Sequence, residues 1–326
     1  GSSWVNTTGS DKDWYDYTAK KWANAKTSDG SMWVWIPRYA YSITSGYHSS
    51  SAGNIDVEFM KGLTNETSTG RKSFNNASGQ GKWNIHPAFN YGTTVSGIWV
   101  AKFEASNSGG KIKVEPGVQS WRSITVNDIY TNCLNYNKTL NSHMMKNDEW
   151  GAVAYLSKSK YGKNAEVTIN SNSSYYTGGG SGNAYVSNIG QSTTGTVHGV
   201  YDMSGGAWEY VAAYVDNSYT TSYGSSLVNG DAKTKNVYSK ASTDNATNNY
   251  NANSSKYGDA VYETSTSGSG STSWYGDYSD FPNAGGPFFQ RGGHYTGGTD
   301  EGVFFFYNYY GGTSSYLSFR PVLVAF

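Results

Sequence analysis

The sequence has a single cysteine, Cys133, and no net charge. One thiol excludes an intramolecular disulfide, a cysteine-rich zinc site and a two-cysteine redox centre, so we expect Cys133 to be a small buried residue. Because 24 basic residues balance 24 acidic ones, no global field attracts polyanions, and we expect no nucleic-acid partner. No run of about eighteen apolar residues occurs, so we also expect no direct insertion into a membrane.

Charged residues are scarce as well, at 15% of the chain, whereas Gly, Ser, Thr, Asn and Tyr are abundant. The usual charged share is about a quarter, so this surface is expected to be polar but largely uncharged, which is typical of proteins outside cells. Gly1-Ser2-Ser3 resembles a cloning scar, so we expect a natural N-terminal anchor or signal to be missing. The predicted location is a cell surface, the extracellular space or a virion.

No repeat of fixed period and no charged or proline-rich linker divides the chain. We therefore predict one domain over residues 1–326, with insertions near 48–81, 170–194 and 216–279. Long loops without structure are uncommon inside domains, so these stretches are either functional excursions or are packed by their own tyrosines.

Two stretches have the composition of strands. Residues 31–43 cluster aromatic and β-branched residues around Pro37, which predicts a strand with a bulge or an edge position. A second strand is predicted over Gly97–Glu104.

Two helices are predicted further along the chain. Ile129, Cys133 and Tyr136 recur at helical spacing after Thr125, which favours a helix near 125–140 that begins with a capping box. A second helix is expected to begin at Asn147 as N-cap, with acidic residues in its first turn, and to end at Tyr161-Gly162.

Three motifs follow in a fixed order: Gly-Val-Tyr-Asp-Met-Ser-Gly-Gly-Ala-Trp-Glu-Tyr-Val at 199–211, Arg-Gly-Gly at 291–293 and Ser-Phe-Arg at 318–320. This series resembles the formylglycine-generating, sulfatase-modifying enzyme family. The resemblance implies an α+β fold of the C-type lectin type, with two helices, small twisted antiparallel sheets and long irregular loops. Within the motifs, Asp202 and Glu209 can bind a cation or pair with Arg291 or Arg320. We favour a buried salt-bridge lattice over catalysis.

The chemistry of that family does not fit this chain. The enzymes it resembles use paired cysteines with copper, which one cysteine cannot supply, and the five histidines lack the spacing of the related iron site. The calcium motifs of sugar-binding C-type lectins are also missing. We therefore expect no enzymatic activity and no cofactor, and leave a structural calcium ion open. The alternatives are a metal-dependent enzyme of this superfamily with an unrecognised site, and a structural surface protein.

The last residues, 291–326, suggest a binding function in place of an enzymatic one. Between His294 and Leu317 the chain has no Lys, Trp, Gln or Met, and Glu301 is its single Glu. This composition resembles the variable proteins of diversity-generating retroelements, in which adenine-specific mutagenesis rewrites a C-terminal segment and does not produce these five residue types. The resemblance implies a hypervariable surface that binds a protein or glycan ligand on another cell, host or phage. Glycine-rich binding loops in general also favour Tyr, Ser and Gly.

Strand alternation assigns sides within this segment. If Gly302–Asn308 is a strand, Phe304 and Phe306 face the core, and Phe319–Leu323 forms a structural strand with Arg320 paired internally. The alternative for the outward aromatic residues is packing under a neighbouring loop. The residues predicted to form the binding surface are His294, Tyr295, Thr296, Asp300, Phe305, Tyr307, Asn308, Tyr309, Tyr310, Ser314, Ser315, Tyr316 and Leu317.

Overall fold

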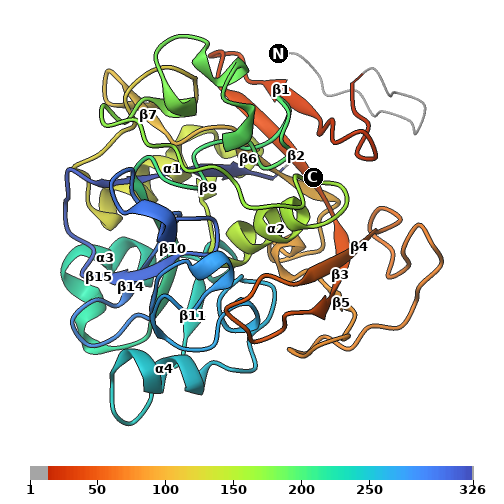
Figure 1. Cartoon of the computed structure of the whole chain (residues 1–326). Helices are drawn as coiled ribbons and strands as arrows, with labels where there is room; N and C mark the ends of the chain where they lie inside the picture. The colour runs from red at the N-terminus through yellow and green to blue at the C-terminus, as the bar shows by residue number, and fades with distance from the viewer. Residues whose placement is uncertain (1–13, 325–326) are drawn as a thin grey trace.

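The computed structural model describes residues 14–324, which form a mixed α+β fold with four α-helices and several small, mostly antiparallel sheets (Figure 1). Gly1-Ser2-Ser3 and the last two residues of the predicted variable segment lie outside this range. The predicted α+β class is thus confirmed, but two helices were expected and four are present. These are α1 (Val126–Tyr136), α2 (Asn147–Lys158), α3 (Thr221–Val228) and α4 (Ala246–Ala252).

The first predicted helix is confirmed as α1. The Thr125 hydroxyl accepts a hydrogen bond from the Asp128 N–H at 3.2 Å, and Ile129 and Cys133 are buried as expected. A side chain that accepts from an early N–H satisfies a donor that has no partner within the helix, which explains the sharp start.

The second predicted helix exists, but its predicted ends are wrong. Lys146 rather than Asn147 is the N-cap of α2, and its backbone N–H donates to the Glu149 carboxylate at 2.8 Å. Asn147 cannot cap because its side chain is already engaged, donating to Tyr238 and accepting from Arg291. The helix ends at Lys158, three residues before the predicted Tyr161.

The predicted strand over 31–43 is two strands in two sheets. Pro37 is the last residue of β2 (Met32–Pro37), and β3 (Tyr39–Ser45) begins after Arg38. A proline has no N–H to continue a ladder, so it marks a change of sheet here rather than a bulge. β3 lies at the centre of a three-stranded sheet between β4 (Asn54–Phe59) and β5 (Asn84–Ile85).

The five-stranded sheet is buried on both faces. Along β2, Val34 and Ile36 belong to one hydrophobic cluster and Trp33 to another, as strand alternation requires. In spatial order its strands are β1 (Asn24–Lys26), β2 (Met32–Pro37), β6 (Gly97–Ala101), β17 (Pro321–Leu323) and β9 (His143–Met144).

The seven-stranded sheet carries most of the terminal segment. Its strand β10 pairs with β14 on one side and with β11 and β16 on the other, and Tyr210 and Val211 alternate between the two hydrophobic clusters. The strands are β10 (Trp208–Val215), β11 (Asn236–Tyr238), β12 (Ser269–Gly270), β13 (Ser279–Asp280), β14 (Phe288–Arg291), β15 (Phe306–Tyr309) and β16 (Leu317–Phe319). A separate hairpin joins β7 (Ser106–Ser108) to β8 (Lys111–Lys113).

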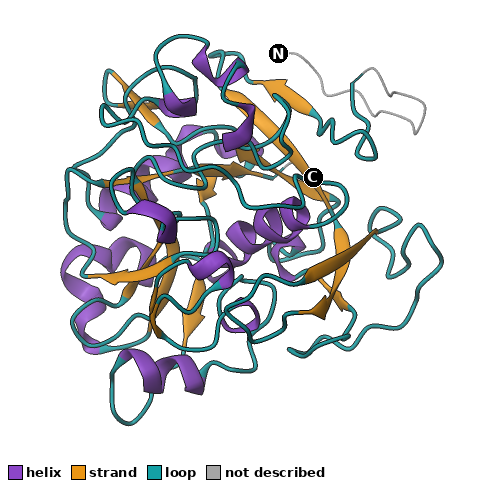
Figure 2. Ribbon diagram, viewed as in Figure 1, coloured by secondary structure: helices purple, strands orange, loops and turns teal. Residues whose placement is uncertain are grey.

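Much of the remaining chain is loop, as Figure 2 shows, yet the 216–279 stretch is packed by its own aromatic residues. Tyr238, Tyr250 and Trp274 from this stretch are buried in the same hydrophobic cluster as Trp150 of α2. The stretch also contains α3, β11 and α4, so it is not a loop without structure.

Arg320 lies where the terminal chain passes from one sheet to the other, between β16 and β17. Its guanidinium pairs with the Glu209 carboxylate of β10, with Nε 2.8 Å from Oε2, and donates to the Ala101 and Tyr201 carbonyls at 3.0 and 3.1 Å. Arg320 and Glu209 are fully buried. The internal pairing predicted for Arg320 is confirmed.

Two further carboxylates lie near this pair. Asp202 accepts from the Gly178 N–H and the Asn170 amide at 2.8 and 3.0 Å. Glu104 accepts from the Ala207 N–H at 2.9 Å, and burial, together with the neighbouring charges of Asp202 and Glu209, raises its pKa well above the ordinary value. The buried lattice predicted around Asp202 and Glu209 is therefore present.

We expect Arg320→Met to lower the free energy of unfolding by about 3–5 kcal/mol, because it leaves Glu209 charged, buried and without its partner. Urea unfolding followed by circular dichroism measures this loss. Lys61→Met is the matched control, because Lys61 pairs with Glu66 at the exposed surface and its removal should change little. Equal effects of the two substitutions would contradict a structural role for the buried pair.

Candidate ligand-binding surface

The surface segment starts at a rigid turn. Gly293 has a φ of +75°, and a Cβ at this position would lie 2.4 Å from the Cα of Glu301. Only glycine tolerates both this conformation and this close approach of the Glu301 backbone. The Arg-Gly-Gly motif therefore allows the 294–301 loop to pack closely against the end of β14. Arg291 secures the same turn from inside, because its guanidinium donates to the Phe305 carbonyl at 2.9 Å and to the Asn147 side chain at 2.7 Å.

Trp208, the first residue of β10, lies at the centre of an aromatic cluster built from the terminal segment. Its ring centroid is 6.4 Å from those of Phe305 and Tyr307, both nearly parallel to it, and 6.3 Å from that of Tyr316. The His294 ring is 5.1 Å away. We call Trp208, Tyr295, Tyr307 and Tyr316, together with the His294 and Phe305 rings beneath them, the Trp208 patch.

Glu301 fixes the orientation of the central indole. The Trp208 Nε1–H donates to its carboxylate at 2.9 Å, and the His294 backbone N–H donates to the same oxygen. Burial raises the pKa of Glu301 to about 7, although these two donors act to lower it. The carboxyl group that holds Trp208 and His294 therefore changes charge near neutral pH.

A second layer supports the edge of the patch from the 120s and 170s. The Tyr175 hydroxyl lies 2.8 Å from His294 Nε2, and the Arg122 guanidinium stacks 3.8 Å from the Tyr175 ring centroid. Arg122 also donates to the Ser315 carbonyl at 2.7 Å, which fixes the loop that carries Tyr316. Burial, followed by the charge of Arg122, lowers the pKa of His294 to about 4, so this ring is neutral at physiological pH.

Most of the predicted surface residues do reach solvent. Tyr316 is 46% and Tyr310 41% exposed. The remaining exposed or half-buried members of the predicted set are Tyr295, Thr296, Asp300, Tyr307, Asn308, Tyr309, Ser314 and Ser315.

Three predicted surface residues are buried, so their predicted exposure is wrong. His294 is enclosed by Trp208 and Tyr316 and is held by Tyr175. Leu317 begins β16, where it pairs in register with Trp208 and joins the hydrophobic cluster. Both residues are therefore buried beneath the surface and support it, and they are not part of its exposed face.

Phe305 is the third buried residue. Its exposure was predicted from a strand over 302–308, and that strand is shorter than predicted. Only Phe306–Tyr309 is a strand, because residues 302–305 form a turn in which the Asp277 carboxylate accepts from the Gly302 and Phe304 N–H groups. The turn breaks the strict alternation, so Phe304 and Phe306 are buried as predicted but Phe305 is buried as well.

Tyr309 and Tyr310 form a second aromatic group at the far end of β15. Their ring centroids are 4.5 Å apart, and Tyr310 packs edge-on against Tyr223 while Tyr309 lies 6.2 Å from Tyr210. Tyr309 thus has a packing role in addition to its partial exposure.

Four residues of this surface were not predicted from the sequence: Trp208, Tyr175, Arg122 and Tyr278, whose ring lies 6.0 Å from that of Tyr307. Trp208 belongs to the motif at 199–211, but that motif did not assign it to the surface. No local pattern distinguishes the other three, because their proximity to the patch depends on contacts between distant segments.

Within residues 14–324 we find no group of three or more His, Cys, Asp and Glu side chains that could hold a metal ion. No helix of that range is long and apolar enough to cross a membrane. No model of a known protein family matches the chain, and a search of curated proteins found no match.

We expect the stability contributed by Glu301 to depend on pH. Its folded pKa of about 7 lies above its ordinary value, so the native state retains a proton that the unfolded chain releases. This contribution is present in acid and is lost as the pH rises through 7. The difference in the free energy of unfolding between the native protein and Glu301→Gln should therefore shift against the native protein by about 3 kcal/mol from about pH 4 to pH 8.

Urea titrations of both proteins across this range test the expectation. Other titrating groups are common to the two proteins and cancel in the difference. Parallel pH profiles would show that Glu301 titrates normally in the folded state.

Proposed function

We propose that this protein is a non-enzymatic binding protein that presents the Trp208 patch to a protein or glycan on another cell, host or phage. Its scaffold would be a C-type lectin fold of the formylglycine-generating type. The mixed α+β architecture agrees with this proposal. The observation that carries the proposal is the division of the terminal segment. Arg291 and Arg320 at its ends are fully buried, whereas Tyr295, Tyr307 and Tyr316 between them reach solvent.

The chemistry of the patch suits recognition. Tyrosine and tryptophan supply large contact areas with few rotatable bonds, and they dominate the binding energy of many interfaces. Ring contacts with Phe305 and His294 hold Tyr307 and Tyr316 in place before a ligand arrives. Such preorganisation lowers the entropy lost on binding.

We further propose that the segment is the variable region of a diversity-generating retroelement. Residues of the types that adenine-directed mutagenesis yields occupy the solvent-reaching positions, including Tyr295, Asn308 and Tyr316. Glu301, which is not among those types, is the residue whose carboxylate holds Trp208 and the His294 backbone. This arrangement suits a segment in which the frame is constant and the exposed residues change.

A protein of this kind would work at a cell surface, outside the cell or on a virion. The low charge content supports such a location, since polar uncharged surfaces are typical there. Binding would need no cofactor.

We expect Tyr316→Ala to weaken ligand binding by about 30-fold or more, as loss of a central aromatic contact does at many interfaces. A ligand would first be identified on protein and glycan arrays, and its affinity would then be measured by calorimetry. Tyr219→Ala is the matched control, because Tyr219 is 59% exposed and lies outside the patch. An unchanged affinity of Tyr316→Ala would remove the patch as the binding surface, and loss of solubility or assembly in its place would favour a structural surface protein.

The retroelement proposal predicts a genomic arrangement. Near the gene we expect an imperfect copy of the sequence that encodes residues 291–323, with differences concentrated at adenines, beside a reverse-transcriptase gene. Sequencing of the locus decides this point. Absence of such a copy would reject the retroelement but would leave the binding protein intact.

A further inference from the structure

A cleft of about 460 Å³ lies outside the Trp208 patch, between the turn from β1 to β2, the β7–β8 hairpin and the last turn of α1. Its lining includes Asp29 of the turn, Lys111 of the hairpin, and Asn132, Asn135 and Tyr136 of the helix. Ligand clefts of roughly 300–1,000 Å³ accommodate small organic molecules, so this cleft is large enough for a ligand of one or two rings.

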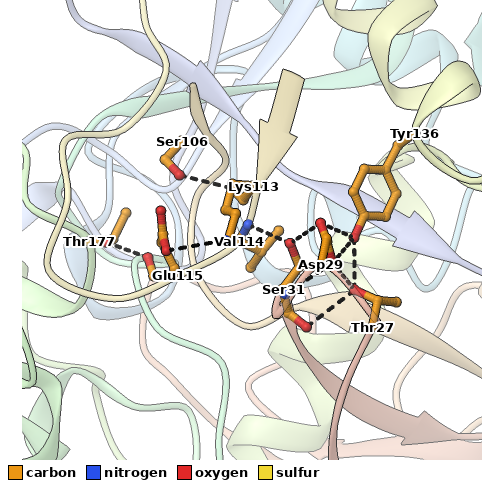
Figure 3. Close-up of polar contacts among 9 residues, drawn as sticks. All are labelled: Thr27, Asp29, Ser31, Ser106, Lys113, Val114, Glu115, Tyr136 and Thr177. Carbon is orange, nitrogen blue, oxygen red and sulfur yellow. Dashed lines mark hydrogen bonds and ion pairs between the residues drawn. The ribbon is translucent and has the colours of Figure 1, made fainter. Parts of the chain in front are cut away.

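One wall of the cleft is held rigidly. The Asp29 carboxylate accepts hydrogen bonds from the hydroxyls of Thr27 at 2.6 Å, Ser31 at 2.8 Å and Tyr136 at 3.1 Å (Figure 3). Partial burial acts to raise the pKa of Asp29, but these hydrogen bonds outweigh it and lower the pKa. Asp29 is thus a fixed negative charge whose hydrogen-bonding capacity is largely used by the protein.

The hairpin is tied to the same wall. The Ser31 hydroxyl oxygen accepts from the Val114 N–H at 3.0 Å, and Figure 3 shows this link continuing from Asp29 toward β8. At the next residue the Met32 N–H donates to the Val114 carbonyl at 2.9 Å. The turn, the hairpin and the helix end therefore hold the cleft open without a ligand.

The facing side chains retain free polar groups. The Asn135 amide and the Lys111 ammonium make no hydrogen bond or ion pair with any residue in the described range 14–324. Asn132 donates to the Asp128 carbonyl at 2.8 Å and keeps its own side-chain oxygen for another partner. The cleft thus offers both donors and acceptors that protein contacts do not use.

This lining selects a class of ligand. The charges of Asp29 and Lys111 oppose each other, so neither a strongly anionic nor a strongly cationic ligand gains a net attraction. Ile112 is buried and Tyr136 is half-buried, and the lining mixes apolar atoms with polar ones, so a wholly apolar ligand would leave polar groups of the cleft without partners. Sugar hydroxyls, which both donate and accept, match amide side chains that do the same.

We propose that this cleft is a binding site for a neutral mono- or disaccharide, contacted by Asn132, Asn135 and Lys111 beside the fixed Asp29–Tyr136 wall. The site is independent of the function proposed above, because no residue of the Trp208 patch lines it. It would give the protein a second, constant point of contact with a glycosylated target.

The test uses the intact chain labelled with ¹⁵N and titrated with glucose, galactose, mannose and N-acetylglucosamine and with a disaccharide of each. Ligands of this size in open polar sites bind with a Kd on the order of 1 mM. We expect at least one of these sugars to give saturable shifts of the Asn132, Asn135 and Lys111 amides. Absence of saturable shifts with all eight probes, or shifts confined to other residues, would overturn the proposal.

The paired substitution Asn135→Ala with Lys111→Ala should weaken this binding about tenfold or more, because it removes two hydrogen-bonding groups of the site. Neither side chain bonds to other described residues, so the thermal midpoint should not change. Asn251→Ala with Lys240→Ala is the matched control, since it removes one exposed amide and one exposed ammonium elsewhere. Equal affinities of the two double variants would overturn the proposal, whereas retained sugar binding in Tyr316→Ala would support a separate site.

Discussion

The structure depends most on the buried pair of Arg320 and Glu209. Leu317–Phe319 completes one sheet and Pro321–Leu323 completes the other, so Arg320 stands at the single residue between them. Its guanidinium joins Glu209 of β10 to the Ala101 carbonyl at the end of β6. An ion pair in this position fixes the register of the terminal strands. A one-residue slip of the terminal chain would leave both charges buried and unpaired.

That constraint explains how one segment can be both frame and surface. Arg320 fixes its far end, and Arg291, bound to Asn147 and to three backbone carbonyls, fixes its near end. The chain between them is held by Glu301, whose carboxylate meets Trp208 and the His294 backbone. Tyr295, Tyr307 and Tyr316 reach solvent from this fixed backbone, as the proposed variable surface requires.

Local chemistry was enough to predict several elements. Thr125 and the spacing of Ile129 and Cys133 predicted α1, and the motif residues predicted that Arg320 would be paired inside the protein. The errors arose where a distant residue overrode a local pattern. Asp277 turns residues 302–305 and buries Phe305, and the contacts of Asn147 with Tyr238 and Arg291 moved the cap of α2 to Lys146.

The sequence by itself determined the class of surface, aromatic and polar with few charges, and the residues that frame the terminal segment. Composition and short-range periodicity carry this information, because each depends only on residue types and their nearest neighbours in the chain. Only the tertiary structure decided that Trp208, Tyr175 and Arg122 join the terminal tyrosines in one patch. Ring contacts and hydrogen bonds bring these residues together across 53 to 119 positions of the chain, and no local pattern records such a contact.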